Sequence, residues 1–301
     1  MTQGLFKCYT ACGLALIWID QQGLEKEVVK PPMQYLELVL VGLGAGSWGT
    51  LIGAGGGFVI VPILFFMFPD KSAATITAIS LVAVFFNGIS AAQAYARQRR
   101  IDFGLGLLFL TATLPGAVLG ALIVNYIPRG AFQLAFGSLL CVLAVYILLR
   151  PRKMVPAGVV SRSSPRRITD SRGNVYEYRV NKVAGLFINF AIGFAAGMLG
   201  VGGGIFNVPT FVMILGVPMQ IATATSAFML VGTSLASNVT NVIEGDLWGQ
   251  WGLAAALTVG TIIGAQVGAW FSQRVGTLWV SRALALGLVV VGARLIWIGI
   301  G

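Results

Sequence analysis

Two ten-residue stretches decide the fold of this chain: GAGGGFVIVP at residues 53–62 and GVGGGIFNVP at residues 200–209. Each stretch begins G-x-G-G-G, and a proline follows five residues after the last glycine. Close packing of helices in lipid is the simplest explanation of a glycine run. Three adjacent glycines do not lie on one helix face, however, and each costs about 0.5–1 kcal/mol relative to alanine inside a helix. We therefore predict that both runs interrupt a helix.

The composition places these runs in a membrane protein. Of 301 residues, 57% are hydrophobic and only 10% are charged, whereas soluble chains are about 45–50% apolar and about 25% charged. A spanning helix needs about 20 mostly apolar residues, and about eight runs of the chain qualify. They are 35–52, 73–96, 103–126, 132–149, 183–199, 221–243, 251–271 and 279–300. The sequence thus predicts an all-α polytopic protein that is multi-pass in the cell (inner) membrane.

The predicted spans form two homologous four-span repeats. Further similarities follow the glycine runs in the same order: ATIT at 74–77 matches ATAT at 222–225, and Asp102 matches Asp246. Four segments result: an N-terminal extension at 1–34, a first membrane repeat at 35–149, a linker at 150–182 and a second membrane repeat at 183–301. The extension is interpreted as an interfacial helix or an extra anchor, with a cleaved signal peptide as the alternative.

Charge indicates the orientation of the chain. The linker at 150–182 holds nine Lys and Arg residues against two acidic ones, and the loop at 97–100 reads RQRR. Lys and Arg accumulate in the cytoplasmic loops of membrane proteins, so both segments are expected on the cytoplasmic face. The repeat makes the loop at 244–246 equivalent to the basic loop, yet it is acidic. Opposite charges on equivalent loops favour inverted repeats over parallel ones.

Breaking a helix at membrane depth frees N–H groups that lipid cannot satisfy. A new helix would start near Phe58 and near Ile205, and each N-terminus would attract an anion. Secondary transporters hold substrate between such paired broken helices. We predict anion contacts from the backbone of the runs and from hydroxyl and amide side chains: Gly55, Gly56, Gly57, Gly202, Gly203, Gly204, Asn207, Thr77, Thr225 and Ser226. Structural roles at the helix breaks are assigned to Gly53, Pro62, Gly200 and Pro209.

The sequence excludes many catalytic chemistries. It contains no histidine and three scattered cysteines, which leaves out Ser-His-Asp and Cys-His catalysis, His metal sites and a disulfide framework. We therefore predict no enzyme activity, no metal and no cofactor. A Rossmann dinucleotide site is also disfavoured, because Phe58 and Ile205 stand where G-x-G-x-x-G requires glycine.

The paired glycine runs with their prolines, the positions of Asp102 and Asp246, and the central hydrophilic linker resemble the TauE/SafE sulfite exporter family. The resemblance covers nearly the whole chain from about residue 35 onwards. It implies a transporter built from a duplicated four-span unit. It further implies transport of sulfite, of related anions such as sulfoacetate, or of other organic anions.

The expected function is export of a small anion, with sulfite or an organosulfonate such as sulfoacetate as the leading substrates. Export is favoured because it is downhill by about 2.3 kcal/mol per unit charge per 100 mV, and because no carboxylate lies deep in a predicted span. The expected partners are the anionic substrate and the lipid bilayer, without nucleic acid, and a homo-oligomer is compatible with the sequence. An importer coupled to an ion gradient, a non-transporting membrane scaffold and a membrane enzyme are the alternatives.

Overall fold

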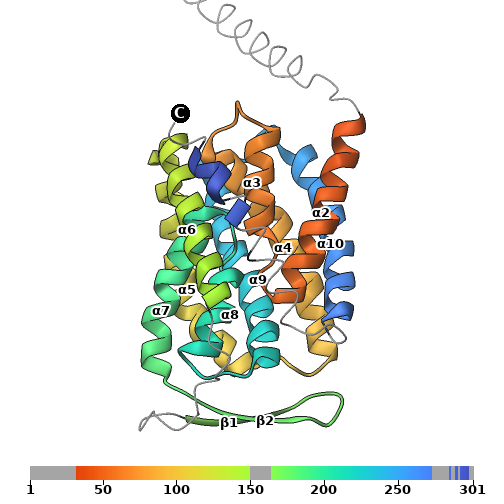
Figure 1. Cartoon of the computed structure of the whole chain (residues 1–301), viewed down its shortest axis with the longest axis vertical. Coiled ribbons are helices and arrows are strands. Elements are labelled where there is room, and N and C mark those ends of the chain that lie inside the picture. Colours follow the sequence, from red (N-terminus) through yellow and green to blue (C-terminus); the bar gives the residue numbers. More distant parts are fainter. Residues whose placement is uncertain (1–31, 150–163, 273–284, 286–288, 291, 298–301) are drawn as a thin grey trace, which may run out of the picture. The chain divides into compact units, whose positions relative to one another are not determined.

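The computed structural model describes residues 32–149, 164–272, 285, 289–290 and 292–297, and this part of the chain is mainly helical (Figure 1). The helices are α2 (Pro32–Ile52), α3 (Gly57–Met67), α4 (Ala73–Arg97), α5 (Phe103–Ile123), the 3-10 turn η1 (Val124–Tyr126), α6 (Arg129–Leu149), α7 (Lys182–Leu199), α8 (Gly204–Met213), α9 (Met219–Glu244) and α10 (Trp251–Phe271). One antiparallel hairpin joins strands β1 (Ser164–Thr169) and β2 (Val175–Val180).

Six of the described helices are long and apolar enough to cross a membrane, namely α2, α4, α5, α7, α9 and α10. They coincide with six of the predicted runs, which confirms an all-α polytopic membrane protein. The fourth predicted run lies within α6, of which Arg129–Val142 is a shorter apolar helix. Only 285, 289–290 and 292–297 of the eighth run are described, and residues 1–31 and 150–163 lie outside the described part. A total of eight spans therefore stays a prediction.

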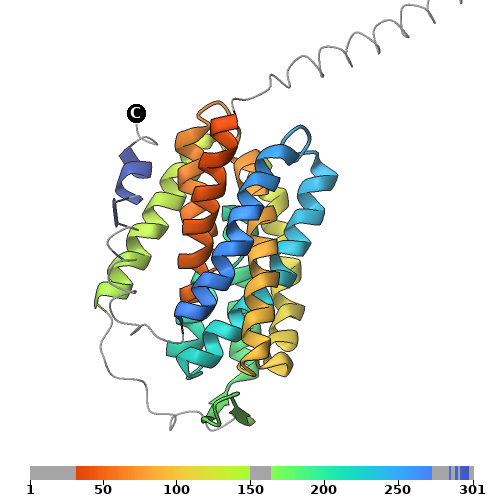
Figure 2. The same cartoon turned by 90° about the vertical axis from the view of Figure 1, so that its right-hand side faces the viewer.

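The two halves of the sequence are interleaved within the compact unit formed by residues 38–301. Helix α4 packs against α9 and α10, and α5 packs against α7 and α9. Each of these contacts joins a helix before the linker to a helix after it, and Figure 2 shows α4 and α10 side by side. The repeats therefore share one helix bundle.

Glycines allow the outer helix pairs to approach backbone to backbone. A Cβ added to Gly120 of α5 would lie 2.1 Å from the carbonyl oxygen of Phe194 in α7. On the other side of the bundle, a Cβ on Gly260 of α10 would lie 2.0 Å from the carbonyl oxygen of Val39 in α2. Small residues at four-residue spacing permit this contact in lipid. The glycines at these two interfaces are Gly116, Gly120, Gly193 and Gly197, and Gly42, Gly46, Gly260, Gly264 and Gly268.

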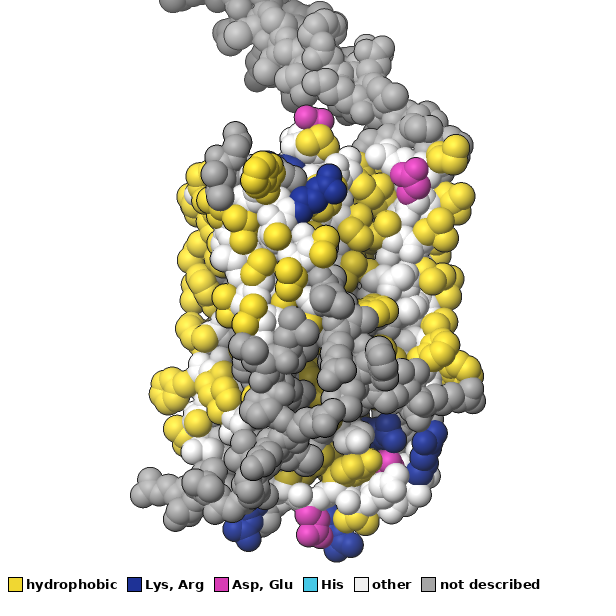
Figure 3. Space-filling view, viewed as in Figure 1, with side chains coloured by type: hydrophobic (Ala, Val, Ile, Leu, Met, Phe, Trp, Pro, Cys, Tyr) yellow, Lys and Arg dark blue, Asp and Glu magenta, His cyan; other side chains and the backbone are white. Residues whose placement is uncertain are grey.

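Loops that are equivalent in the two halves lie at opposite ends of the bundle. The loop after α4 contacts the hairpin, because Ser171 N donates to Gln98 O at 3.0 Å. The loop after α9 contacts the loop before α4, because Lys71 Nζ donates to the Gln250 side chain at 2.5 Å. We call these the hairpin end and the opposite end (Figure 1). Between them, hydrophobic side chains dominate the visible side of the molecule in Figure 3.

The hairpin was not predicted, because the linker was interpreted only as a basic polar segment. Its turn is organised by Asp170, which accepts hydrogen bonds from the amides of Arg172 at 2.8 Å and Asn174 at 3.0 Å. Burial alone would raise the pKa of Asp170. The hydrogen bonds from Asn174, Arg172 and Arg100 outweigh burial and lower this pKa to about 2. Asp170 is therefore a fixed negative charge at neutral pH.

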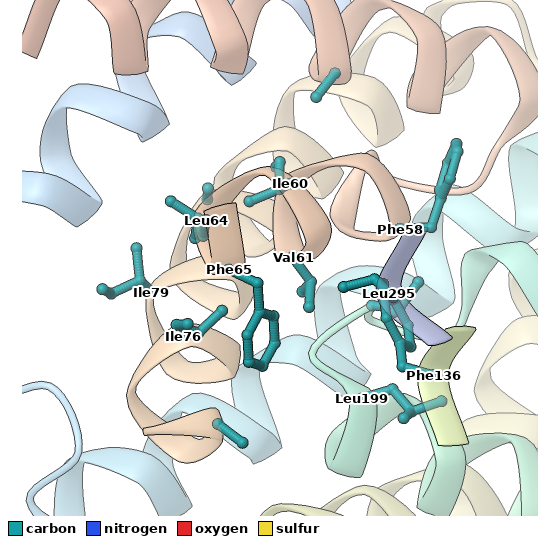
Figure 4. Close-up of a cluster of buried hydrophobic side chains, with 14 of the residues drawn as sticks. Phe58, Ile60, Val61, Leu64, Phe65, Ile76, Ile79, Phe136, Leu199 and Leu295 are labelled. Carbon is teal, nitrogen blue, oxygen red and sulfur yellow. The ribbon is translucent and has the colours of Figure 1, made fainter. Parts of the chain in front are cut away.

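Helix α3 is held by an apolar cluster around the first break. Figure 4 shows Val61 and Phe65 of α3 in a cluster with Ile76 of α4, Phe136 of α6 and Leu199 of α7. The Phe65 ring stacks on Phe132 with centroids 5.3 Å apart. A half-helix too short to span the membrane is thus anchored by protein rather than by lipid.

The glycine contacts yield a stability prediction. Replacing Gly120 with Ala places a methyl group where the Phe194 carbonyl oxygen lies, so α5 and α7 must separate. We expect a loss of about 1–3 kcal/mol, as for other overpacked sites, seen as a lower unfolding temperature in detergent. The control is Gly44→Ala in α2, where a Cβ meets nothing within 4 Å. Equal stability of the two variants would contradict tight packing at Gly120.

Candidate functional site

Both glycine runs interrupt a helix, as predicted. Helix α2 ends at Ile52 and α3 begins at Gly57, while α7 ends at Leu199 and α8 begins at Gly204. The interruptions share one backbone conformation, with positive φ angles at three equivalent pairs of glycines. The values are +80° and +72° for Gly53 and Gly200, +76° and +72° for Gly55 and Gly202, and +79° and +87° for Gly56 and Gly203. Residues with a Cβ rarely adopt this region, which explains the glycines.

The two breaks lie against each other in the protein interior. A Cβ on Gly57 would lie 2.8 Å from the carbonyl oxygen of Gly200, and a Cβ on Gly204 would lie 2.6 Å from the carbonyl oxygen of Gly53. The contact is reciprocal, as the sequence repeat requires. Both segments are buried, with Ala54 and Val201 at 0% exposure. The predicted site residues of the two runs are therefore brought together.

Each break is held by a serine from the other half of the sequence. Ser226 Oγ in α9 donates to Gly53 O at 3.0 Å. Ser80 Oγ in α4 donates to Gly200 O at 2.8 Å. These bonds satisfy carbonyl groups that the broken helices leave without an intrahelical partner. The central helices α4 and α9 thus support both breaks.

The N-termini of α3 and α8 expose the donors that an anion needs. The carbonyl oxygen of Gly56 accepts from the amides of Val59 and Ile60. The carbonyl oxygen of Gly203 accepts from the amides of Phe206 and Asn207. Within the described residues, no oxygen accepts from the amides of Gly57 or Phe58 in α3. The same holds, over that described part, for Gly204 and Ile205 in α8. Neither helix has a side-chain cap.

Asn207 adds a side-chain donor at the second break. It is 0% exposed, and neither Nδ2 nor Oδ1 has a partner among the described residues. Its Nδ2 lies 3.6 Å from the position of a Cβ on Gly203, the N-cap of α8. A buried amide without a partner costs about 1–3 kcal/mol, so such a group in a folded protein requires an explanation.

The other predicted side-chain donors are already engaged. Thr77 Oγ1 donates to Ala74 O at 2.8 Å, and a Cβ on Gly200 would touch Thr77. Ser226 holds Gly53, as described above. Thr225 Oγ1 accepts from Asp102 N at 3.0 Å, in the loop at the hairpin end. Pro62 and Pro209 lie inside α3 and α8, beyond the breaks.

Two further buried asparagines lie outside the set of predicted site residues. Asn189 in α7 is 0% exposed, and Asn241 in α9 is 1% exposed. Among the residues that the structure describes, Oδ1 of Asn189 and both side-chain polar atoms of Asn241 have no partner. Asn87 in α4 is the contrasting case, because its side chain accepts from Thr50 Oγ1 at 3.1 Å and donates to Thr261 O at 3.1 Å. An asparagine within an apolar span was the available signal. Sequence alone does not distinguish a bonded amide from an open one.

The donors around the breaks are neutral backbone amides, hydroxyl groups and carboxamides. Among the described residues, no group of three or more His, Cys, Asp and Glu side chains could hold a metal ion. Three ion pairs lie at the hairpin end and join Arg100 to Asp170, Arg166 to Asp102 and Arg167 to Glu177. The arrangement is suited to binding an anion through dipoles rather than through a counter-charge.

Comparison with known proteins decides the family. Residues 38–295 match the family model described as "Sulfite exporter TauE/SafE". The chain belongs to the TauE/SafE family. It is 31% identical to the probable membrane transporter protein YunE of Bacillus subtilis, over 89% of this chain and 99% of YunE. It is therefore a multi-pass membrane transporter of this family.

More distant relatives extend the match. A probable membrane transporter protein of Methanocaldococcus jannaschii is 25% identical over 85% of this chain and 92% of its own length. The probable membrane transporter protein YfcA of Escherichia coli is 22% identical over 86% of this chain and 88% of its own length. No solved structure is significantly similar. The description of the glycine breaks and of the interleaved bundle in this TauE/SafE chain therefore rests on the present structure alone.

The contrast between Asn87 and Asn207 can be tested by stability. Asn87→Leu strands Thr50 Oγ1 and the Thr261 carbonyl, so we expect a loss of about 1–3 kcal/mol. Asn207→Leu removes an amide that has no partner among the described residues, and we expect unchanged or higher stability. Thermal unfolding in detergent compares the two variants. A loss of equal size in Asn207→Leu would mean that its amide is engaged within the fold.

Proposed function

We propose that this protein exports a small anion, with sulfite as the leading substrate, and that the anion binds between the N-termini of α3 and α8. The observation that carries the proposal is the unpartnered, fully buried amide of Asn207 beside the N-cap of α8. It lies next to backbone amides that donate no hydrogen bond within the described residues. The family match and the transporter names of the relatives are consistent with this function.

Helix N-termini supply the binding energy in this proposal. Each carries the positive end of the helix dipole, equivalent to roughly half an elementary charge. The amides of Gly57 and Gly204 lie on facing breaks, and in this proposal both dipoles act on the same bound anion. Asn207 Nδ2 supplies a further donor. These groups replace hydrogen bonds that the anion makes to water before it enters.

The neutral donor set favours a singly charged anion. The cost of removing an ion from water rises with the square of its charge, so a dianion loses about four times as much hydration energy as a monoanion of equal size. No compensating side-chain charge is present among the described residues at the breaks. We therefore propose hydrogensulfite or a simple sulfonate as the transported form. Sulfoacetate, whose carboxylate and sulfonate both ionise, is disfavoured.

We propose inverted repeats with the hairpin end in the cytoplasm. Two observations support the inverted arrangement of the repeats: the loops after α4 and α9 lie at opposite ends, and α2 and α7 run in opposite directions in Figure 1. The basic linker and the basic loop at 97–100 then lie on the cytoplasmic side, in agreement with the positive-inside rule. In cells with a negative interior, this arrangement allows efflux driven by the membrane potential alone.

Thiol labelling tests the topology. Arg97→Cys places an exposed thiol at the end of α4, and Trp248→Cys places one after α9, in a protein whose native cysteines are replaced by alanine. We expect a membrane-impermeant reagent to reach position 248 in intact cells and position 97 only after permeabilisation. Equal access of both positions from one side would eliminate the inverted arrangement.

Anion efflux from proteoliposomes tests function and charge selectivity together. Methanesulfonate keeps one negative charge at every pH, sulfate keeps two near neutrality, and sulfite changes from one to two as pH rises. We expect methanesulfonate efflux to be independent of pH and sulfite efflux to fall by up to about tenfold per pH unit above its second pKa. An inside-negative potential should accelerate both. Asn207→Leu should remove most of the flux at normal stability.

The outcomes of this assay separate the parts of the proposal. Absence of flux for every anion would overturn the transport function. Sulfate efflux as fast as methanesulfonate efflux would overturn the charge selectivity but retain anion transport. Normal flux in Asn207→Leu would move the binding site away from the second break. Flux that requires an ion gradient would favour the importer.

A further inference from the structure

Asp102 occupies a junction between three elements at the hairpin end. Its Oδ1 caps α5 by accepting from Leu105 N at 2.9 Å and also pairs with Arg166 of β1. Its Oδ2 accepts from the Tyr178 hydroxyl of β2 at 2.6 Å. Burial and the Asp102 carboxylate raise the pKa of Tyr178, so this hydroxyl remains a proton donor. Capping of α5 alone would not require the contacts between Asp102 and the hairpin.

A second set of contacts fixes the tip of the hairpin. Arg100 Nη2 lies 3.2 Å from Asp170 Oδ2 in an ion pair whose side chains are 10% and 0% exposed. The amide of Ser171 donates to Gln98 O at 3.0 Å. The inner face of β2 is apolar, and it completes a cluster with the nearby ends of α5, α8 and α9. Its buried members include Tyr178, Val180, Leu105, Phe211, Val217 and Ile221.

The junction at Asp102 continues to the first glycine break. The Asp102 amide donates to Thr225 Oγ1 at 3.0 Å, near the start of α9. The next residue, Ser226, donates to Gly53 O at 3.0 Å. Thr223 in the same turn lies against Gly53, where an added Cβ would be 2.7 Å from its methyl group. One turn of α9 therefore connects the hairpin contacts to the break.

We propose that the β1–β2 hairpin is a gate latch for the transport cycle, with Asp102 as the positioning residue that joins it to the first break. The inference rests on the proposed transport function. Substrate can reach a buried site from the hairpin end only if α8 and the start of α9 move relative to α5. The hairpin ties these three elements together. Its contacts with Asp102 are polar and partly exposed at Arg166, so they can exchange with water during opening.

A permanent structural clamp is the competing interpretation. It predicts that the hairpin stays in place while other elements move. A latch must instead release in each cycle. Covalent closure distinguishes these possibilities, because it leaves a clamp unchanged and arrests a latch.

A reversible cross-link provides the test. Gln98→Cys with Ser171→Cys joins the hairpin tip to the loop after α4, at positions whose backbones are already hydrogen-bonded. The control pair is Arg167→Cys with Glu177→Cys, which face each other within the hairpin. Both pairs are built in protein whose Cys8, Cys12 and Cys141 are replaced by alanine. Methanesulfonate efflux should fall at least about tenfold when the first pair is closed, and should return on reduction.

A second measurement tests the latch without any transport assay. Tyr178→Phe removes only the hydroxyl that donates to Asp102, so amide exchange in 175–180 should accelerate by about tenfold or more in lipid nanodiscs. Arg167→Gln is the control, because its pair with Glu177 is exposed at 69% and 71%. Unchanged exchange in Tyr178→Phe would overturn the role of Asp102 as the latch contact.

The two measurements separate the latch from the function on which it rests. Full efflux with the tip cross-link closed would overturn the latch while leaving anion transport intact. Absence of efflux in the unlinked protein would overturn the transport function, and with it the gating role. In that case the exchange experiment still decides whether Asp102 holds the hairpin.

Discussion

The structure depends on the mutual burial of two helix breaks. Lipid offers no hydrogen bonds to the groups that a broken helix frees, so those groups must find partners inside the protein. The carbonyl oxygens of Gly53 and Gly200 obtain them from Ser226 and Ser80, each located in the other half of the sequence. Neither repeat can complete its own break. Each repeat therefore requires the other, and the interleaved bundle follows from this requirement.

Close packing of the outer helices complements this central constraint. Glycines at the α5–α7 and α2–α10 interfaces let backbones meet, and each interface again joins the two halves. The half-helices α3 and α8 pack mainly against the central helices α4 and α9 instead. An alternating-access cycle would then proceed by movement at the breaks and at the ends of the bundle.

The proposed binding site and the proposed latch involve residues at which the two halves of the sequence differ. Asn207 follows the second break, whereas the equivalent residue after the first break is Ile60. The hairpin follows the first repeat, and its contacts reach Asp102 from Tyr178 and Arg100 from Asp170. A symmetric scaffold thus carries an asymmetric set of polar groups. The proposed single site and the proposed latch both depend on this difference.

The sequence by itself determined six spans and both breaks, because apolar length and glycine conformational freedom are local properties that need no knowledge of neighbours. Helix starts expected near Phe58 and Ile205 were found at Gly57 and Gly204. Tertiary structure alone decided which polar groups are bonded: Thr225 bonds to the loop at Asp102, Asn87 is bonded to Thr50 and Thr261, and Asn207 has no partner in the described part of the chain. The hairpin also escaped prediction, since its stability comes from contacts with distant helices. A hydrogen bond depends on the position of both partners, and only the folded chain specifies that position.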